Sequence, residues 1–409
     1  MKKLLILILL VVSSVGGYAS CLNKFEIKRG INLSHWLSQR IENGPSIQEG
    51  MNETDFNRIA RAGFDHVRLP IDEKVLWHEN GEKDKEAFSY LHKGIRWALQ
   101  NDLKVIVDLH IVRSHYFNAG HDGKKNLLWE SAEAQAHFLQ LWQELVQELK
   151  EYPTSDVAYE IMNEPTAPNH EDWNKLVEKA YQVIRKVEKE RVLVIGSNMW
   201  QGVYTFPFLK VPEGDEYILL SCHFYEPFLL SHYQAGWTEF GNYQGAVHYP
   251  GELVTKQEFD ALSEADRKLT GRFRGMVWNK AMLASFLSKA KQVADEKGLN
   301  LYCGEFGIYE KAPKADALRW YKDVIEVFDS LDIAWSIWDY KGGFGVYTSQ
   351  GLPKKELMHT LMSGSGEKIA VGGTPLYLDA RKPLELRVKD ALSRMTLEEK
   401  TRLSYADGR

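Results

Sequence analysis

The sequence predicts an α/β protein built around a single (β/α)8 barrel, with a short incomplete segment at the C-terminal end. Three observations support this fold class. Of the 409 residues, the part between the terminal segments comprises roughly 350, the size of one such barrel with long loops. Runs rich in Val, Ile and Leu alternate with amphipathic stretches, as in a parallel sheet covered by helices. No Gly-x-Gly-x-x-Gly motif follows the first run, which argues against an open dinucleotide-binding sheet.

Eight strands are expected in order along the chain, because short β-rich runs recur between helical stretches. They are Ile27–Leu33, Asp65–Leu69, Lys104–His110, Asp156–Asn163, Arg191–Ser197, Tyr217–His223, Leu301–Glu305 and Ile333–Trp338. The helical stretches between them include Ala132–Lys150, Glu171–Lys189, Asn279–Lys297 and Ala315–Asp329. The segment from Glu226 to Gly275, with Trp237, Tyr243 and Tyr249, is too long for an ordinary connection. We therefore expect a functional loop there, beside the site.

The N-terminal residues 1–20 predict a signal peptide. Lys2 and Lys3 precede nine consecutive apolar residues, and Ala19 is placed for cleavage. Nine residues are too few to span a bilayer, which needs about 20. Cys21 stands where a bacterial lipoprotein carries its lipid, so a lipid anchor and simple release both stay open. The expected location is outside the cytoplasm of a bacterium: secreted, on the cell surface or in the periplasm.

The expected domain organisation places the barrel at residues 22–362, a Gly/Ser-bearing linker at 363–374 and a highly charged tail at 375–409. Hydrophobic residues make up 44% and charged residues 26%, the balance of a soluble enzyme. The net charge of −5 supplies no basic surface for nucleic acid. We expect a monomer, with Cys222 and Cys303 as buried free thiols, because strand alternation assigns Cys303 to the inside of the barrel and Cys222 to the outside.

Polar groups recur at the carboxyl ends of the expected strands, where the active sites of such barrels lie. They include two glutamates, an arginine, two histidines, a tyrosine and a tryptophan: Arg68, His110, Glu164, His223, Tyr225, Glu305 and Trp338. Because alternate side chains point inward, we expect these groups to converge. Read singly, each has an ordinary structural explanation, and Arg68 could simply pair with Glu160. Their joint occurrence on six strands favours a site.

Two carboxylates among aromatic rings and hydrogen-bond donors indicate glycoside hydrolysis. One carboxyl must stay protonated to serve the leaving oxygen, and the other must stay ionised to attack the anomeric carbon. We assign Glu164 as acid/base and Glu305 as nucleophile, with Glu226 as a carboxylate that the chemistry alone does not exclude. We expect Arg68 and Tyr225 to keep Glu305 ionised, and His110 and His223 to hydrogen-bond the sugar or adjust the pKa values of the carboxyl groups. Asn163 is expected to contact the 2-hydroxyl, and Trp338 to form the flat floor under the sugar at the cleavage point. The aromatic residues Trp36, Trp200 and Trp237 are expected to line an open groove.

The same residues resemble glycoside hydrolase family 5, the cellulase-like barrels. The matching motifs are Arg29–Leu33 with His35 and Trp36, Gly63–Pro70, Asp108–His110, Asn163–Pro165, His223–Tyr225, Gly304–Phe306 and Trp335–Tyr340. The resemblance implies a retaining mechanism with Glu164 as acid/base and Glu305 as nucleophile, and no metal or organic cofactor. One departure is the stretch from Ile111 to Asn118, which replaces a shorter turn and should line the substrate groove.

The tail resembles a different family. Tyr377–Asp379 followed by Arg387–Lys400 is similar to the opening of glycoside hydrolase family 3, and contains no catalytic residue. The resemblance implies a truncated start of a second enzyme domain. An ordinary amphipathic helix, capped at Thr396 with Glu399 at its third position, is the alternative.

These observations together predict a secreted endo-β-1,4-glucanase that acts on cellulose-type β-glucan. On the same barrel, β-mannan, xyloglucan, mixed-linkage glucan and β-1,3-glucan stay open as substrates. From other classes, a non-catalytic polysaccharide-binding barrel would lack a glutamate, and both are present. A metal-dependent hydrolase using His35, His110 and His223 would need closely spaced histidine pairs on the first strand, which the sequence lacks.

Overall fold

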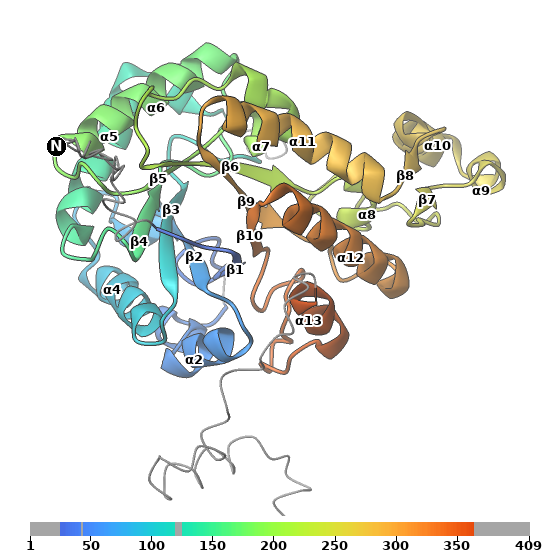
Figure 1. Cartoon of the computed structure of the whole chain (residues 1–409), viewed down its shortest axis with the longest axis horizontal. Coiled ribbons are helices and arrows are strands. Elements are labelled where there is room, and N and C mark those ends of the chain that lie inside the picture. Colours follow the sequence, from blue (N-terminus) through green and yellow to red (C-terminus); the bar gives the residue numbers. More distant parts are fainter. Residues whose placement is uncertain (1–24, 42–43, 119–124, 364–409) are drawn as a thin grey trace, which may run out of the picture.

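The computed structural model describes residues 25–41, 44–118 and 125–363. Eight parallel strands close into a barrel in the order β1-β10-β9-β6-β5-β4-β3-β2, surrounded by helices (Figure 1). The strands are β1 Arg29–Asn32, β2 His66–Asp72, β3 Lys104–Ile111, β4 Val157–Glu160, β5 Leu193–Gly196, β6 Ile218–Phe224, β9 Asn300–Phe306 and β10 Ala334–Ile337. This confirms the predicted fold class. The expected signal peptide with Cys21, the tail at 375–409 and all of the linker except Ser363 lie outside the described residues.

Most of the longer helices begin at a residue whose side chain caps the first turn. Ser131, Asn169 and Asn279 each accept a hydrogen bond from a backbone N–H in the first turn of α5, α6 and α11. The longer helices are α2 Glu53–Arg61, α4 Lys85–Leu99, α5 Ala132–Leu149, α6 His170–Arg185, α11 Lys280–Glu296, α12 Lys314–Leu331 and α13 Lys355–Met362. In the described part of the chain, no helix is both long and apolar enough to cross a membrane.

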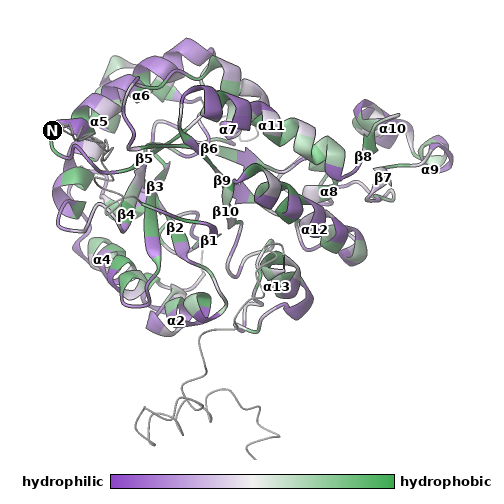
Figure 2. Ribbon diagram, in the orientation of Figure 1, coloured by the Kyte–Doolittle hydropathy of each residue, from purple (hydrophilic) through white to green (hydrophobic). Residues whose placement is uncertain are grey.

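Two hydrophobic layers hold the barrel together. The outward side chains of the strands pack against the helices in one large core, and these helices carry both hydrophilic and hydrophobic positions, as amphipathic helices do (Figure 2). A smaller cluster made of Phe25, Ile106, Ala158, Val192, Val194, Leu219 and Tyr302 includes the inward side chains nearer the amino ends of the strands. The polar inward side chains lie nearer the carboxyl ends. The barrel is therefore a packed core with its chemistry at one end.

One expectation about side-chain direction is wrong. Cys303 is a register partner of Cys222 on the neighbouring strand, and both belong to the outer core. The register shifts directly after this pair, so that His223 lies opposite Glu305. This β-bulge lets Glu305 face the barrel interior although Cys303, two residues earlier, faces the helices. Both thiols are free and buried, as expected.

The long segment after β6 forms a small subdomain that projects from the side of the barrel (Figure 1). It contains α8 Phe228–Ser231, α9 Lys256–Ala261, α10 Glu264–Thr270, η3 Gly271–Phe273 and the two-stranded sheet of β7 Gly251–Glu252 and β8 Val277–Trp278. Tyr243 and Tyr249 are buried, whereas Trp237 is 46% exposed. Of the three aromatic residues singled out there, only Trp237 lines the cleft described below.

The remaining short elements connect the barrel units. They are α1 Ile47–Gly50, α3 Glu73–Leu76, η1 Leu127–Trp129, α7 Asn198–Gln201 and η2 Val203–Phe208. Of these, α3, α7 and η2 also contribute residues to the cleft described below.

Candidate active site

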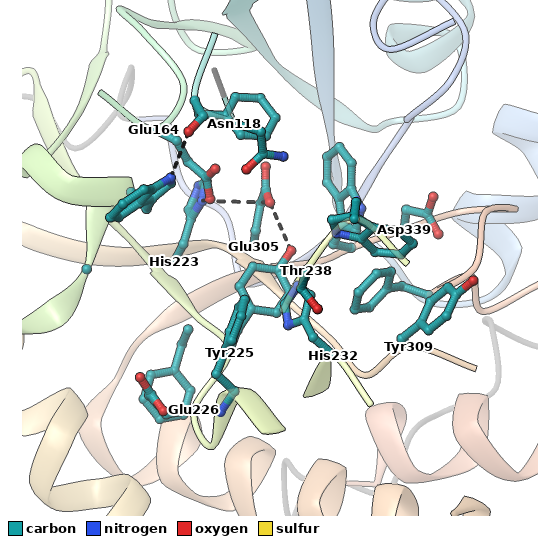
Figure 3. A pocket seen from close by; sticks show the side chains of 18 of the residues that line it. Asn118, Glu164, His223, Tyr225, Glu226, His232, Thr238, Glu305, Tyr309 and Asp339 are labelled. Carbon is teal, nitrogen blue, oxygen red and sulfur yellow. Dashed lines mark hydrogen bonds and ion pairs between the residues drawn. The ribbon is translucent and has the colours of Figure 1, made fainter. Parts of the chain in front are cut away.

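An open cleft of about 1610 Å³ lies across the carboxyl ends of the strands. Several predicted site residues line it: His110, Glu164, His223, Tyr225, Glu305 and Trp338. In Figure 3 the side chains of Glu164, His223 and Tyr225 converge on Glu305. Trp200 and Trp237 also line the cleft, and so does most of the stretch from Ile111 to Asn118, as expected.

Beneath the cleft, Arg68 is fully buried among three carboxylates. Its guanidinium lies 2.6 Å from Glu160, 3.0 Å from Asp108 and 2.7 Å from Glu305. The side chain of Arg68 is 0% exposed and does not line the cleft, so Arg68 is not a substrate-binding residue, although the sequence also suggests that role. Both of its expected contacts within the site, with Glu305 and with Glu160, are present. Arg68 therefore holds the nucleophile candidate from below.

Glu305 has a second partner on the cleft side. The Tyr225 hydroxyl donates a hydrogen bond of 2.9 Å to Oε2 of Glu305, while Arg68 binds Oε1. Burial raises the pKa of Glu305, and the positive charge of Arg68 and the Tyr225 hydroxyl oppose that rise. Each oxygen of this carboxylate is thus held by a donor that favours the ionised form.

Glu164 has an environment that favours the protonated form. Burial and the negative charge of nearby Glu305 raise the pKa of Glu164 well above its usual range. One of its oxygens is 2.8 Å from Nδ1 of His223. Burial lowers the pKa of His223 well below its ordinary value. The backbone of Glu164 is left-handed, with φ of 43°, a conformation that non-glycine residues adopt mainly where the surroundings force it.

The two glutamates and His223 form one compact group. One ligand atom from each of the three side chains lies within 4.8 Å of the other two. In the part of the chain that the structure describes, this is the one group of His, Cys, Asp or Glu residues close enough to surround a metal ion, and His35 and His110 are outside it. Within the group, Nδ1 of His223 already bonds to Glu164 and lies 3.7 Å from Glu305, so the arrangement suits proton transfer.

Asn163 and His110 each keep a buried nitrogen without a hydrogen-bond partner among the described residues, and of the two only His110 lines the cleft. Oδ1 of Asn163 accepts a 2.8 Å hydrogen bond from Arg68, and its buried Nδ2 has no partner among the described residues. Nδ1 of His110 is 2.7 Å from Asp108, and its Nε2 likewise has no partner in the described chain. Burial lowers the pKa of His110 to about 4, so the ring is neutral near pH 7. The free Nε2 of His110 is therefore available to a hydroxyl group of a ligand in the cleft.

Trp338 and Trp36 have different surroundings. Trp338 lines the cleft and stacks on His110, with ring centroids 5.6 Å apart and planes 5° apart. Trp36 is 1% exposed, donates its indole N–H to the carbonyl of Ile47 and stacks against Trp97. The expectation that Trp36 contacts substrate is therefore wrong, because its ring belongs to the core between the barrel and the helices.

Two residues at the site, Tyr204 and Gln201, were absent from the sequence-based prediction. Tyr204 lines the cleft and is 53% exposed, and Gln201 lies below it with a bond to Glu160. Neither belongs to a recognisable motif, although the nearby Trp200 offered an aromatic signal. Glu226, the third carboxylate considered, lies apart from the glutamate pair in Figure 3 and accepts a hydrogen bond from the backbone of Phe228.

Comparison with known proteins agrees with this geometry. The model of the cellulase family, glycosyl hydrolase family 5, matches residues 28–343. Endoglucanase C of Acetivibrio thermocellus is 31% identical over 342 residues, covering 82% of this chain and 97% of that protein. Cellodextrinase A of Ruminococcus flavefaciens is 28% identical and covers 75% of this chain and 84% of that protein.

Solved structures give the same result. The structure of Thermotoga maritima Cel5A in complex with cellobiose superposes with a TM-score of 0.66 at 26% identity, covering 82% of this chain and 97% of that one. The complex of Thermotoga maritima Cel5A with mannotriose gives 0.65 at 25% identity, covering 83% and 98%. This chain thus belongs to glycosyl hydrolase family 5, the cellulase family, and is a glycoside hydrolase of the endoglucanase type.

Proposed function

We propose that this protein hydrolyses internal β-1,4 bonds of cellulose-type glucans with retention of anomeric configuration. The observation that carries the mechanism is the pairing of Glu164 and Glu305, whose nearest oxygens lie within 4.8 Å. Retaining glycosidases hold their carboxyl groups about 5–5.5 Å apart, whereas inverting enzymes need about 6.5–9.5 Å to admit a water between carboxyl and sugar. The pair is therefore too close for direct attack by water.

In the first step, Glu305 attacks the anomeric carbon as the glycosidic bond breaks. Glu164 gives its proton to the departing oxygen, which is why a raised pKa is useful at that position. The product is a glycosyl ester on Glu305, with a shortened sugar chain as leaving group. In the second step, Glu164 takes a proton from water, and this water attacks the anomeric carbon and restores the Glu305 carboxylate.

The surrounding residues act on charge and position. Arg68 and Tyr225 bind the two oxygens of Glu305 and keep it ionised before attack. Asn163 precedes the acid/base directly and has a buried Nδ2 without a partner in the described chain; we assign this nitrogen to the 2-hydroxyl, where a hydrogen bond strengthens in the transition state. Trp338, backed by His110, offers a flat face under the sugar at the cleavage point.

Cleavage within a polymer requires a groove that is open at both ends. The cleft extends well beyond the glutamate pair, and exposed aromatic rings stand along it: Trp200 is 44% exposed and Trp237 is 46% exposed. The match to this chain covers 97% of the length of relatives that are named as endoglucanases. Both facts support an endo mode of action on β-glucan.

A β-mannan substrate is the second candidate. It is favoured by the likeness to Thermotoga maritima Cel5A, which was solved with mannotriose as well as with cellobiose. The mechanism would be unchanged, because mannose and glucose differ only in the orientation of the 2-hydroxyl that Asn163 would contact.

The test is product analysis on carboxymethyl cellulose, lichenan and β-mannan, with wild type beside Glu164→Ala and Glu305→Ala. A rapid fall in viscosity of the cellulose derivative, absent in both variants, supports the proposal. Cleavage of mannan alone would keep the mechanism and change the substrate. If wild-type protein binds these polymers without cleaving any of them, the proposal is wrong and a binding function replaces it.

We also propose export through residues 1–20, with Cys21 as a possible lipid attachment point, and action as a monomer. Fractionation of a bacterial host that expresses the full chain, with labelled palmitate and a Cys21→Ala control, tests export and lipidation. Light scattering tests the monomer. For residues 375–409 we propose the start of a family 3 domain that the barrel does not need, so truncation after residue 362 should leave the activity unchanged.

A further inference from the structure

A strained turn lies at the carboxyl end of β5, next to the catalytic pair. Met199, Trp200 and Gln201 all have left-handed backbones, with φ of 57°, 58° and 53°. Bulky L-residues rarely adopt this conformation, and three in a row persist only where surrounding contacts impose it. Contacts with the surrounding residues must therefore hold this turn in its strained conformation.

Gln201 is the deepest residue of the turn. Its side chain is 0% exposed, and its Nε2 donates a 3.0 Å hydrogen bond to Oε1 of Glu160 inside the barrel. A Cβ on Gly196 would lie 2.2 Å from this Nε2, so the glycine leaves the space that the amide occupies. The side chain of Gln201 therefore extends into the barrel interior and fills the space beside Gly196.

The exposed residue of the turn is Trp200. Its backbone N–H donates to the carbonyl of Pro165, which follows Glu164 directly, and its indole N–H donates to the carbonyl of Phe117, which also lines the cleft. Gly202, which directly follows the turn, forms a β-bridge with His223 on β6. Trp200 is therefore fixed on the side of the cleft that belongs to Glu164.

We propose that Gln201 is a positioning residue that holds Trp200 as the stacking surface for the sugar of the leaving group. The inference rests on the proposed function: Glu164 delivers a proton to the leaving oxygen, so the leaving sugar must lie on the Glu164 side. Trp200 provides a half-exposed flat ring there. The buried bond from Gln201 to Glu160 holds the strained backbone that presents this ring.

A second route for Gln201 must be separated from this one. Glu160 also binds Arg68, which binds Glu305, so loss of Gln201 could instead disturb the nucleophile. That route would change the ionisation of Glu305 and slow every substrate. The route through Trp200 would affect only substrates whose leaving group is a sugar.

The experiment compares cellopentaose with 2,4-dinitrophenyl β-cellobioside, whose activated leaving group needs neither proton nor sugar contact. Gln201→Met keeps the volume and removes the donor, and Gly196→Ala displaces the same amide from the other side. Trp200→Ala removes the ring at a solvent-exposed position. We expect each to lower kcat/KM on cellopentaose by about tenfold, while the rate on the aryl glycoside changes by less than about twofold.

A double-mutant cycle then decides the route. If Gln201 acts through Trp200, then Gln201→Met combined with Trp200→Ala loses no more than Trp200→Ala alone, and the acidic limb of the pH profile stays in place. Losses that multiply, equal losses on both substrates, or a displaced acidic limb would overturn the proposal. The proposal would also be overturned if Trp200→Ala, a substitution at an exposed position, left the ratio of kcat/KM on the two substrates unchanged. A wild type inactive on both substrates would instead refute the proposed function itself.

Discussion

The hydrogen bond from Tyr225 to Glu305 gives a sharp test of how the nucleophile is kept ionised. The Tyr225→Phe substitution removes one oxygen and leaves the ring, which packs against His232 and Phe344. The hydroxyl donates to a carboxylate oxygen at 2.9 Å in a site where Glu305 is 5% exposed. Little else in the site should change, because this tyrosine bonds through its hydroxyl to Glu305.

The magnitude follows from the charge of the acceptor. A hydrogen bond to an ionised group contributes about 1.5–3 kcal/mol, and about 1.4 kcal/mol corresponds to a factor of ten in an equilibrium. Because the bond favours the carboxylate, its loss raises the pKa of Glu305. The acidic limb of kcat/KM should then move to higher pH by about 1 pH unit or more. Arg68 still binds the other oxygen, so activity is retained above the new limb.

The assay is kcat/KM against pH on a soluble aryl cellobioside, with thermal unfolding measured on the same samples. Tyr233→Phe is the matched control, since its hydroxyl donates at 2.9 Å to the carbonyl of Gly245 in the subdomain. An acidic limb that stays in place in Tyr225→Phe, or moves equally in the control, would refute this account of the ionised nucleophile.

Three further predictions concern the groups around the same site. Glu305→Gln should fold normally and lose at least about a thousandfold in turnover, because it removes the nucleophile. Glu190→Gln, at an exposed position, is the control. Near-normal turnover of Glu305→Gln would contradict the assignment. Arg68→Met should lower the free energy of unfolding by about 3–5 kcal/mol, since three buried carboxylates lose their cation; denaturant titration measures this, and an unchanged midpoint would be inconsistent with the buried network. Trp36→Ala should cost about 3–5 kcal/mol of stability as a core truncation, yet leave KM for cello-oligosaccharides unchanged; a raised KM at normal stability would return Trp36 to the substrate site.

The barrel could be predicted from sequence because its signal is repeated. Eight apolar runs with polar ends require only the alternation of a strand and the covering of a parallel sheet, and each predicted run overlaps an observed strand. Convergence of Glu164, His223 and Glu305 followed from the same rule, since the carboxyl ends of all eight strands meet at one end of the barrel.

The rule failed where the backbone departs from regular geometry. Alternation placed Cys303 and Glu305 on one side, but the bulge beside His223 separates them. The left-handed turn at 199–201 carries no glycine, so no residue type signalled it. Trp36 and Trp200 are both tryptophans near strand ends, and only tertiary packing decides that one is buried and the other lines the cleft.

The central claim is that Glu305 forms a covalent bond with the sugar while Glu164 moves the protons. The most direct measurement is mass spectrometry of the enzyme after incubation with a 2-deoxy-2-fluoro-β-cellobioside that carries an activated leaving group. The fluorine slows both steps, and the good leaving group lets the first one proceed, so the intermediate accumulates. The account predicts one fluorocellobiosyl group on the peptide that contains Glu305. The same label on a peptide containing Glu164 or Glu226, or hydrolysis of cello-oligosaccharides with inversion and no label at all, would contradict it.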